Sequence, residues 1–184
     1  MTPWTGRVVL TIPRAARPHD VHRIDDRKQP AMPSFSEADL QAAVGRAFPG
    51  GEYTVHPWRA WLLADTVLAR PPAVTAGAGP QVAHPLFAWM AATGAMGITW
   101  DELFSWFGAA ASDGPVFGEH ETTLHRPLQV GATYRVSGGI VSAERKVGRR
   151  TGVFDVVGYS MDLHADGEHV ATCWNSIVFP RRDA

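Results

Sequence analysis

The sequence predicts an α+β domain in which one antiparallel β-sheet wraps around a long apolar helix. The 184 residues suit a single domain, and 45% of them are apolar, which is enough for a sizeable core. Apolar residues follow a helical spacing before Pro115 and tend to alternate after it. This change of period places helices in the first part of the chain and strands in the second.

Helix signals begin at Ser36, which is followed by Asp39 and predicts a capped helix over 36–46. A short strand is predicted over 52–56. A second helix is predicted over 57–69, because proline is tolerated in a first helical turn and apolar residues follow at three- and four-residue spacing.

The longest mostly apolar stretch is Val82–Ile98. Its length is marginal for a membrane span, and it includes a histidine, a proline and two glycines. It therefore predicts a helix buried inside the protein, over about 85–96. Thr99 then predicts the N-cap of a shorter helix over 100–107.

Four strands are predicted after Pro115, because β-branched and aromatic residues are frequent there and turn residues separate the runs. Short separators favour antiparallel neighbours. Cys173 falls within the last run and is interpreted as a packing residue on one strand face rather than a nucleophile. The predicted strands are 116–124, 133–144, 153–163 and 169–179.

An apolar helix needs cover on every face, and a curved sheet can provide it. This architecture is the hotdog fold, predicted here as a single domain over residues 35–184. Residues 1–34 are predicted to be a flexible or loosely docked extension, since 14–33 are charged and proline-rich with little apolar period. An arm that reaches a partner subunit is the alternative.

Composition excludes several classes of protein. Seventeen basic against 18 acidic residues argue against a general nucleic-acid-binding protein. The single cysteine excludes an internal disulfide and a cysteine-rich zinc site. With no secretory leader and no membrane span predicted, the expected compartment is the cytoplasm.

Several segments together resemble the MaoC-like hotdog hydratases and the N-terminal dehydratase-type branch of that family. Val82–Ala91, followed by Gly94 and Gly97, is similar to the start of the family's central helix. The family has His-Gly or Ala-Pro-Pro there, and Ala83-His84-Pro85 lies between the two patterns. Further similarity lies at residues 118–121, 125–131, 146–149 and 166–172, so that the resemblance covers roughly 48–182.

The resemblance implies an acyl-thioester substrate carried by coenzyme A or an acyl carrier protein, with no further cofactor. It implies addition of water to a 2-enoyl thioester, or its removal from a 3-hydroxyacyl thioester. Such chemistry needs a general base, a proton donor and N–H donors near the thioester oxygen. A single hotdog layer leaves its sheet edge and one helix side in need of cover, so we expect a homodimer, or a heterodimer with another hotdog chain.

The family's catalytic aspartate and histidine lie shortly before the central helix, and here the match is incomplete. Asp65 lies 19 residues before His84, in about the place of the family aspartate. The residue five positions after Asp65 is Arg70 rather than histidine. Pro85 replaces the glycine that follows the family histidine, and proline has no N–H to offer an oxyanion.

Four residues are the catalytic candidates: Asp65, His84, Glu119 and His120. Asp65 is either a base or a polar residue on the wet face of its helix. His84 either transfers protons, as histidine can near neutral pH, or caps the central helix. Glu119 and His120 are adjacent on a strand, so only one of them points inward.

Lys146, Arg149 and Arg150 form a predicted basic hairpin tip. Their charges could bind the phosphates of the acyl carrier, although a solvated turn is the simpler interpretation. No metal site is expected, because the histidine pairs 120/125 and 164/169 have odd spacings, which on a regular strand place side chains on opposite faces.

Five tryptophans in the helical half are expected to lie mostly in the core, because indole is large and apolar. If some of them line an acyl pocket, the substrate is bulky or compatible with aromatic walls. They are Trp58, Trp61, Trp89, Trp100 and Trp106.

Three functions stay open. The first is a hydratase or dehydratase that uses a rearranged Asp65–His84 pair. The second is a non-catalytic hotdog subunit that shapes the acyl pocket for a catalytic partner, favoured by Arg70 and Pro85. The third is a thioesterase or another activity on a thioester, disfavoured because the central helix offers only Thr93 as a polar side chain.

Overall fold

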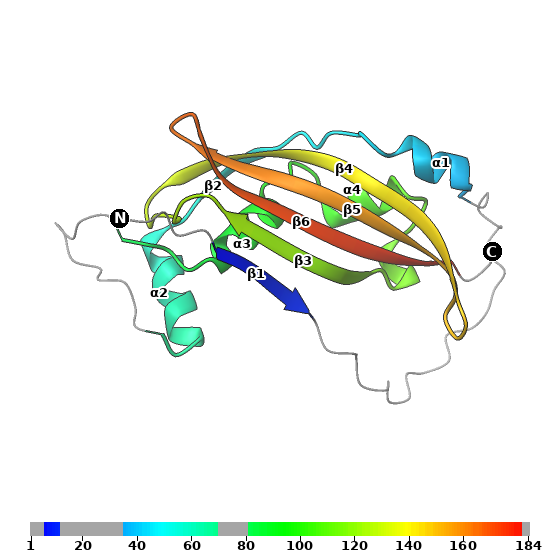
Figure 1. The fold of residues 1–184 in the computed structure, drawn as a ribbon, viewed down its shortest axis with the longest axis horizontal. Helices are drawn as coiled ribbons and strands as arrows, with labels where there is room; N and C mark the ends of the chain where they lie inside the picture. The colour runs from blue at the N-terminus through cyan, green and yellow to red at the C-terminus, as the bar shows by residue number, and fades with distance from the viewer. Residues whose placement is uncertain (1–5, 12–34, 70–80, 182–184) are drawn as a thin grey trace.

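A single six-stranded antiparallel sheet dominates the protein, shown by a computed structural model that describes residues 6–11, 35–69 and 81–181. The strands are ordered β1-β3-β6-β5-β4-β2 across the sheet (Figure 1). Their bounds are β1 Gly6–Thr11, β2 Gly51–Thr54, β3 Val116–Leu124, β4 Thr133–Gly148, β5 Gly152–Ala165 and β6 Glu168–Arg181.

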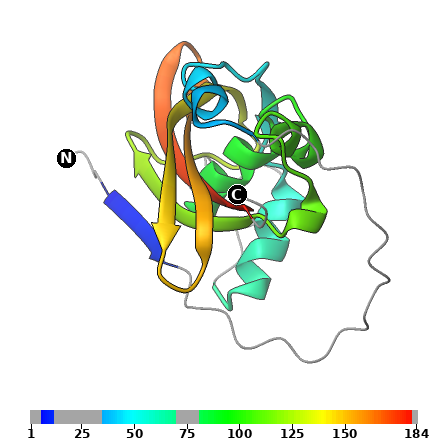
Figure 2. The same cartoon turned by 90° about the vertical axis from the view of Figure 1, so that its right-hand side faces the viewer.

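Helices cover one side of this curved sheet, as Figure 2 shows for the green and cyan elements. The helix α3 contacts β2, β4, β5 and β6, so it lies across the middle of the sheet. The predicted hotdog architecture is therefore confirmed. The helices are α1 Glu37–Ala42, α2 Pro57–Thr66, α3 Leu86–Gly94 and α4 Trp100–Ser105, with a 3₁₀ turn η1 at Ala111–Asp113.

The central helix is shorter than the predicted 85–96. It begins after Pro85 and ends at Gly94, and the chain then turns sharply. Gly97 has a φ of +84°, and a Cβ there would lie 2.5 Å from the Gly50 carbonyl oxygen. This close approach of two backbone segments requires glycine and prevents the helix from continuing.

Small residues let α3 lie close to the sheet. Phe87, Ala88, Ala91 and Ala92 of this helix are fully buried. Alanine brings the helix backbone near the strands, and Phe87 fills the remaining space in the core.

The other predicted elements are present with shifted ends. Ser36 and Asp39 form the predicted capping box of α1, which ends at Ala42 rather than at residue 46. Thr99 caps α4 in the same way, with Glu102 as its partner. The strands β4, β5 and β6 are longer than predicted, because hydrogen bonding between them continues to the hairpin ends.

Part of the predicted extension belongs to the sheet. The strand β1 pairs antiparallel with β3, from Gly6 opposite Leu124 to Thr11 opposite Glu119. The remainder of residues 1–34 lies outside the described residues, so the domain boundary at residue 34 stays a prediction.

The expectation that most of the five tryptophans lie in the core is wrong. Trp58 and Trp61 on α2 are 56% and 41% exposed, while Trp89, Trp100 and Trp106 are half-buried. The helix α2 instead packs through its small residues Ala60 and Ala64, which turn the indoles outward. No helix among the described residues is long and apolar enough to cross a membrane.

One buried carboxylate ties the loops to the sheet. Asp155 on β5 is fully buried, and its oxygens accept hydrogen bonds from Arg145 at 2.7 and 3.0 Å and from Arg181 at 2.8 Å. These arginines also donate to the carbonyl oxygens of Phe35 and Phe107. The carboxylate raises the pKa of Arg145, which keeps the guanidinium charged.

We predict that Asp155→Ala lowers the free energy of unfolding by about 3–5 kcal/mol, because it leaves two arginines without their buried counter-ion. Urea titration followed by tryptophan fluorescence measures this. Arg126→Ala is the matched control, since Arg126 forms an exposed pair with Glu168 and its loss should cost at most about 1 kcal/mol. Equal effects of the two substitutions would contradict the prediction.

Candidate active site

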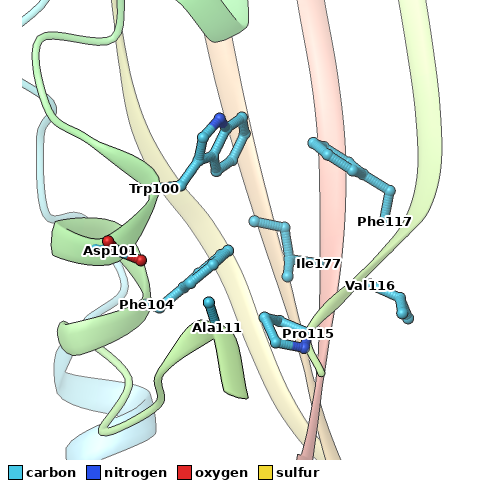
Figure 3. Close-up of a pocket in the computed structure, with 8 residues that line it drawn as sticks. All are labelled: Trp100, Asp101, Phe104, Ala111, Pro115, Val116, Phe117 and Ile177. Carbon is cyan, nitrogen blue, oxygen red and sulfur yellow. The ribbon is translucent and has the colours of Figure 1, made fainter. Parts of the chain in front are cut away.

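An apolar pocket of about 320 Å³ opens between α4, the start of β3 and β6. Trp100 and Phe104 lie four residues apart on α4 and so share one face of that helix. They face Phe117 and Ile177 across the pocket (Figure 3). Asp101 is the only charged residue in the lining. The volume and apolar walls suit the hydrophobic part of a small molecule.

Aromatic contacts connect this pocket to His120 on β3. The Phe117 ring packs against Trp100 with a centroid separation of 5.3 Å, and against Trp89 of α3 at 6.1 Å. Trp89 in turn contacts the imidazole of His120 at 6.3 Å. His120 is half-buried, and its contact with Trp89 places it beside the central helix and outside the pocket lining.

Both ring nitrogens of His120 have partners. Nδ1 lies 2.8 Å from Oδ1 of Asn175 on β6, and Nε2 lies 2.7 Å from Oγ1 of Thr122. Burial lowers the pKa of His120, while its hydrogen bonds to Asn175 and to the Trp174 backbone act in the opposite direction. The net lowering of the pKa favours the neutral imidazole, the state that a general base requires.

Glu119 points away from this cluster. Its side chain is exposed, and its backbone N–H donates to Oγ of Ser176 at 2.9 Å. A β-bulge between Phe117 and His120 shifts the register with β6 at this point. Of the two adjacent candidates only His120 faces the helix, as the alternation of a strand requires, and Glu119 has no place in the cluster.

His84 acts at the start of α3. Its ring is exposed, and Nδ1 accepts the backbone N–H of Leu86 at 3.1 Å. This contact corresponds to the capping alternative, and a catalytic role of His84 stays a prediction. Pro85 has no N–H, and the next one along the helix is already bound to His84, so no free backbone donor is shown at the first two residues after His84.

Asp65 is exposed on α2, one residue after Ala64, the last buried position of that helix. Within the described residues, no hydrogen bond joins Asp65 to His84. Arg70, which stands where the family has its histidine, lies outside the described residues. The proposed Asp65–His84 pair therefore stays a prediction from sequence.

The basic hairpin tip is exposed. Lys146 forms an ion pair with Glu144 at 3.1 Å, and Arg149 and Arg150 lie in the turn between β4 and β5. None of the three lines the apolar pocket. Their role toward the phosphates of an acyl carrier stays a prediction.

Three histidines gather where sequence spacing predicted separation. His164 and His169 lie on neighbouring strands and stack at 5.0 Å, and His125 lies 4.4 Å from His169. Alternation of side chains applies along one strand, but His164 and His169 lie on β5 and β6, which are joined by a hairpin. A register shift at Leu163/His164 helps to bring the histidine rings to one side of the sheet. No group of three or more metal-binding side chains among the described residues is arranged to hold an ion.

Sequence reasoning missed Asn175 and Thr122 as members of the site. Each is unremarkable in the sequence, and only the register of β3 with β6 places Asn175 opposite His120 and Cys173 opposite Thr122. The alternation of the last strand did place Asn175 and Cys173 on one face. The sequence did not show that this face of β6 lies next to the inward face of β3.

Comparison with known proteins shows the fold. No family model and no curated protein matches the chain. The HadBC (3R-hydroxyacyl-ACP dehydratase) complex of Mycobacterium tuberculosis is 19% identical, with a TM-score of 0.54 over 74% of this chain and 96% of that one. The ChsH1-ChsH2 complex of the same organism is 18% identical, with a TM-score of 0.56 over 80% and 90%.

A protein described as a MaoC-like dehydratase is 22% identical, with a TM-score of 0.59 over 78% of this chain and 44% of that one. At these identities the similarities establish a shared fold. They agree with the hotdog architecture derived from the strand order and the position of α3.

We predict that the Cys173 thiol is protected from modification, since it is fully buried and burial raises its pKa to about 11. Ellman's reagent should label it only after denaturation. Val147→Cys supplies a matched exposed thiol at a side chain that is 81% exposed, and this variant should show one fast and one slow cysteine. Rapid labelling of the unsubstituted native protein would contradict the buried placement.

Proposed function

We propose that this chain is a hotdog protein that hydrates 2-enoyl thioesters or dehydrates 3-hydroxyacyl thioesters, with His120 as its proton-transfer group. The observation that carries the proposal is a half-buried, inward-facing histidine joined by Trp89 and Phe117 to an open apolar pocket. The similarity in fold to proteins described as dehydratases supports the same class of reaction.

In the hydration direction, His120 Nε2 takes a proton from water as the water oxygen bonds to C3 of the enoyl group. The electron pair of the C2–C3 double bond moves toward the thioester carbonyl. The imidazolium then returns its proton to C2, so that one water is added and the histidine is restored. Dehydration is the reverse sequence.

Two hydrogen bonds of the ligand-free protein must open for this reaction. Thr122 Oγ1 is hydrogen-bonded to Nε2 of His120, and the reacting water must replace this contact. The Leu86 N–H becomes available to the thioester oxygen only when the exposed His84 ring turns away. His84 is thus assigned to the site as a cap of the helix and not as a base.

The acyl group is proposed to enter the pocket, with its carrier at the surface. The basic hairpin of Lys146, Arg149 and Arg150 lies at the same end of the sheet as the pocket. Val116, which lines the pocket, pairs with Val178 of β6, close to the end of β6 that pairs with the start of β5 after the hairpin. Coenzyme A and carrier-protein arms both present phosphate there, and guanidinium groups bind phosphate well.

A second candidate is a subunit that binds the acyl group while a partner hotdog chain supplies the catalytic groups. It is favoured by Pro85, by the engaged Leu86 N–H, and by both nitrogens of His120 having partners. Two of the proteins with a similar fold are described as complexes. A thioesterase is less favoured, since the Thr93 hydroxyl donates to the Trp89 carbonyl.

We predict that the purified chain removes the enoyl absorbance of crotonyl-CoA or trans-2-dodecenoyl-CoA, and that His120→Ala lowers kcat/KM by about 10²–10⁴-fold. His125→Ala is the matched control and should leave the rate unchanged, because His125 is exposed outside the pocket. Full activity of His120→Ala would exclude the role of His120. No turnover by the folded chain alone, with turnover restored by a second hotdog chain, would establish the partner-dependent candidate.

We predict that Val116→Asp weakens turnover of trans-2-dodecenoyl-CoA more than that of crotonyl-CoA, because a carboxylate in the pocket lining opposes burial of a long acyl chain. The comparison of KM for the two substrates measures the effect. Val141→Asp makes the same change at a side chain of β4 that is 48% exposed, outside both the lining and the basic hairpin, and should alter neither value. An unchanged KM for the long substrate would show that the acyl chain binds elsewhere.

A further inference from the structure

We propose that Asn175 is a positioning residue for His120, which fixes the imidazole orientation and keeps the proton on Nδ1 so that Nε2 retains its lone pair. The inference deepens the proposed function, because it rests on His120 as the proton-transfer group. It concerns a residue that contacts His120 and not the substrate.

The contact is set by strand register. His120 on β3 and Asn175 on β6 are direct cross-strand partners, and both side chains face α3. Asn175 Oδ1 lies 2.8 Å from His120 Nδ1, and an amide oxygen can only accept a hydrogen bond. Nδ1 therefore carries the proton of the neutral ring.

The remaining contacts agree with this tautomer. With its proton on Nδ1, the ring can only accept at Nε2, where Thr122 Oγ1 donates at 2.7 Å. The Thr122 oxygen then accepts from the Cys173 thiol, 3.5 Å away. Burial raises the pKa of Cys173, so the thiol keeps the proton that it donates. Donors and acceptors alternate without conflict from Cys173 to Asn175.

Asn175 is costly to the fold, and a positioning role accounts for its presence. The residue is fully buried, and its Nδ2 has no hydrogen-bond partner among the residues that the structure describes. Burying an unsatisfied amide group destabilises the fold, and an apolar side chain of the same shape would avoid this cost. The amide oxygen that holds His120 is the part of Asn175 that leucine cannot replace.

Among the described residues, Cys173 on β6 and Tyr159 on β5 are the titratable side chains next to Asn175 on the inward face, and burial raises the pKa of each. Asp155 and Arg181 also face inward, but they lie further along β5 and β6 and pair with each other. Trp89 covers the ring from α3 and carries no charge. The acceptor on Asn175 therefore decides which ring nitrogen is protonated.

The test is the tautomer of His120, measured by long-range ¹H–¹⁵N correlation spectra of the full chain and assigned with His120→Ala. The unsubstituted protein is expected to show Nδ1–H. Asn175→Leu should lose that preference, and Thr122→Val should retain it, because only the former removes the acceptor at Nδ1. Asn175→Asp keeps an acceptor and adds negative charge, so it should retain Nδ1–H and raise the pH at which His120 titrates.

Kinetics supply a second readout. Asn175→Leu should lower kcat for crotonyl-CoA about tenfold or more with little change in KM. Such a loss is a part of the rate enhancement that a correctly oriented general base contributes. Asn175→Asp should retain activity and move the acid limb of its pH profile upward, because the added carboxylate favours the imidazolium. Melting temperature and Cys173 protection show whether each variant is folded.

Nε2–H in the unsubstituted protein would overturn the inference, even if Asn175→Leu failed to fold. Nδ1–H persisting in a folded Asn175→Leu would overturn it as well. A tautomer that responds as expected in a protein without turnover would support the positioning role of Asn175 and count against the proposed hydratase activity, so the two failures are distinguishable.

Discussion

Burial of α3 against the sheet is the interaction on which the rest of the structure depends. This helix carries no charged residue and buries Phe87, Ala88, Ala91 and Ala92 completely. Apolar surface on every face must be removed from water, so the strands have to curve around the helix. The curvature in turn brings the side chains at the middle of β3 and β6 to the helix.

That same burial accounts for the character of the candidate site. His120, Thr122 and Asn175 face α3 in a region from which water is largely excluded. Polar groups placed there need partners, and they find them in one another. A low pKa for His120 and a high pKa for Cys173 follow from the loss of solvation.

The loops around the pocket depend on a different anchor. Asp155 binds Arg145 and Arg181, and these two hold the backbone before α1 and the backbone after α4. Because α4 contributes Trp100 and Phe104 to the pocket, the buried ion pairs also stabilise the acyl-binding wall that we propose. Stability and the candidate site are therefore linked through the end of the sheet.

The sequence by itself determined the layout of elements. Apolar period, caps at Ser36 and Thr99, and short turns between the long strands are local signals, and they were sufficient for the order of helices and strands from residue 36 onward. The strand β1 lies in the segment predicted to be an extension and was not predicted. The end of α3 at Gly94 was not predictable, because it depends on the approach of Gly50 to Gly97, far away in the chain. The outward indoles of α2 likewise follow from which face of that helix packs.

Only the tertiary structure decided which candidates form a site. Alternation along β3 showed that Glu119 and His120 point to opposite sides, but not which of them meets the helix. Strand register placed Asn175 beside His120, and it also brought His164 and His169 together where spacing along one strand predicted separation. Register depends on pairing between distant segments, and a single sequence read along its length contains no direct signal of it.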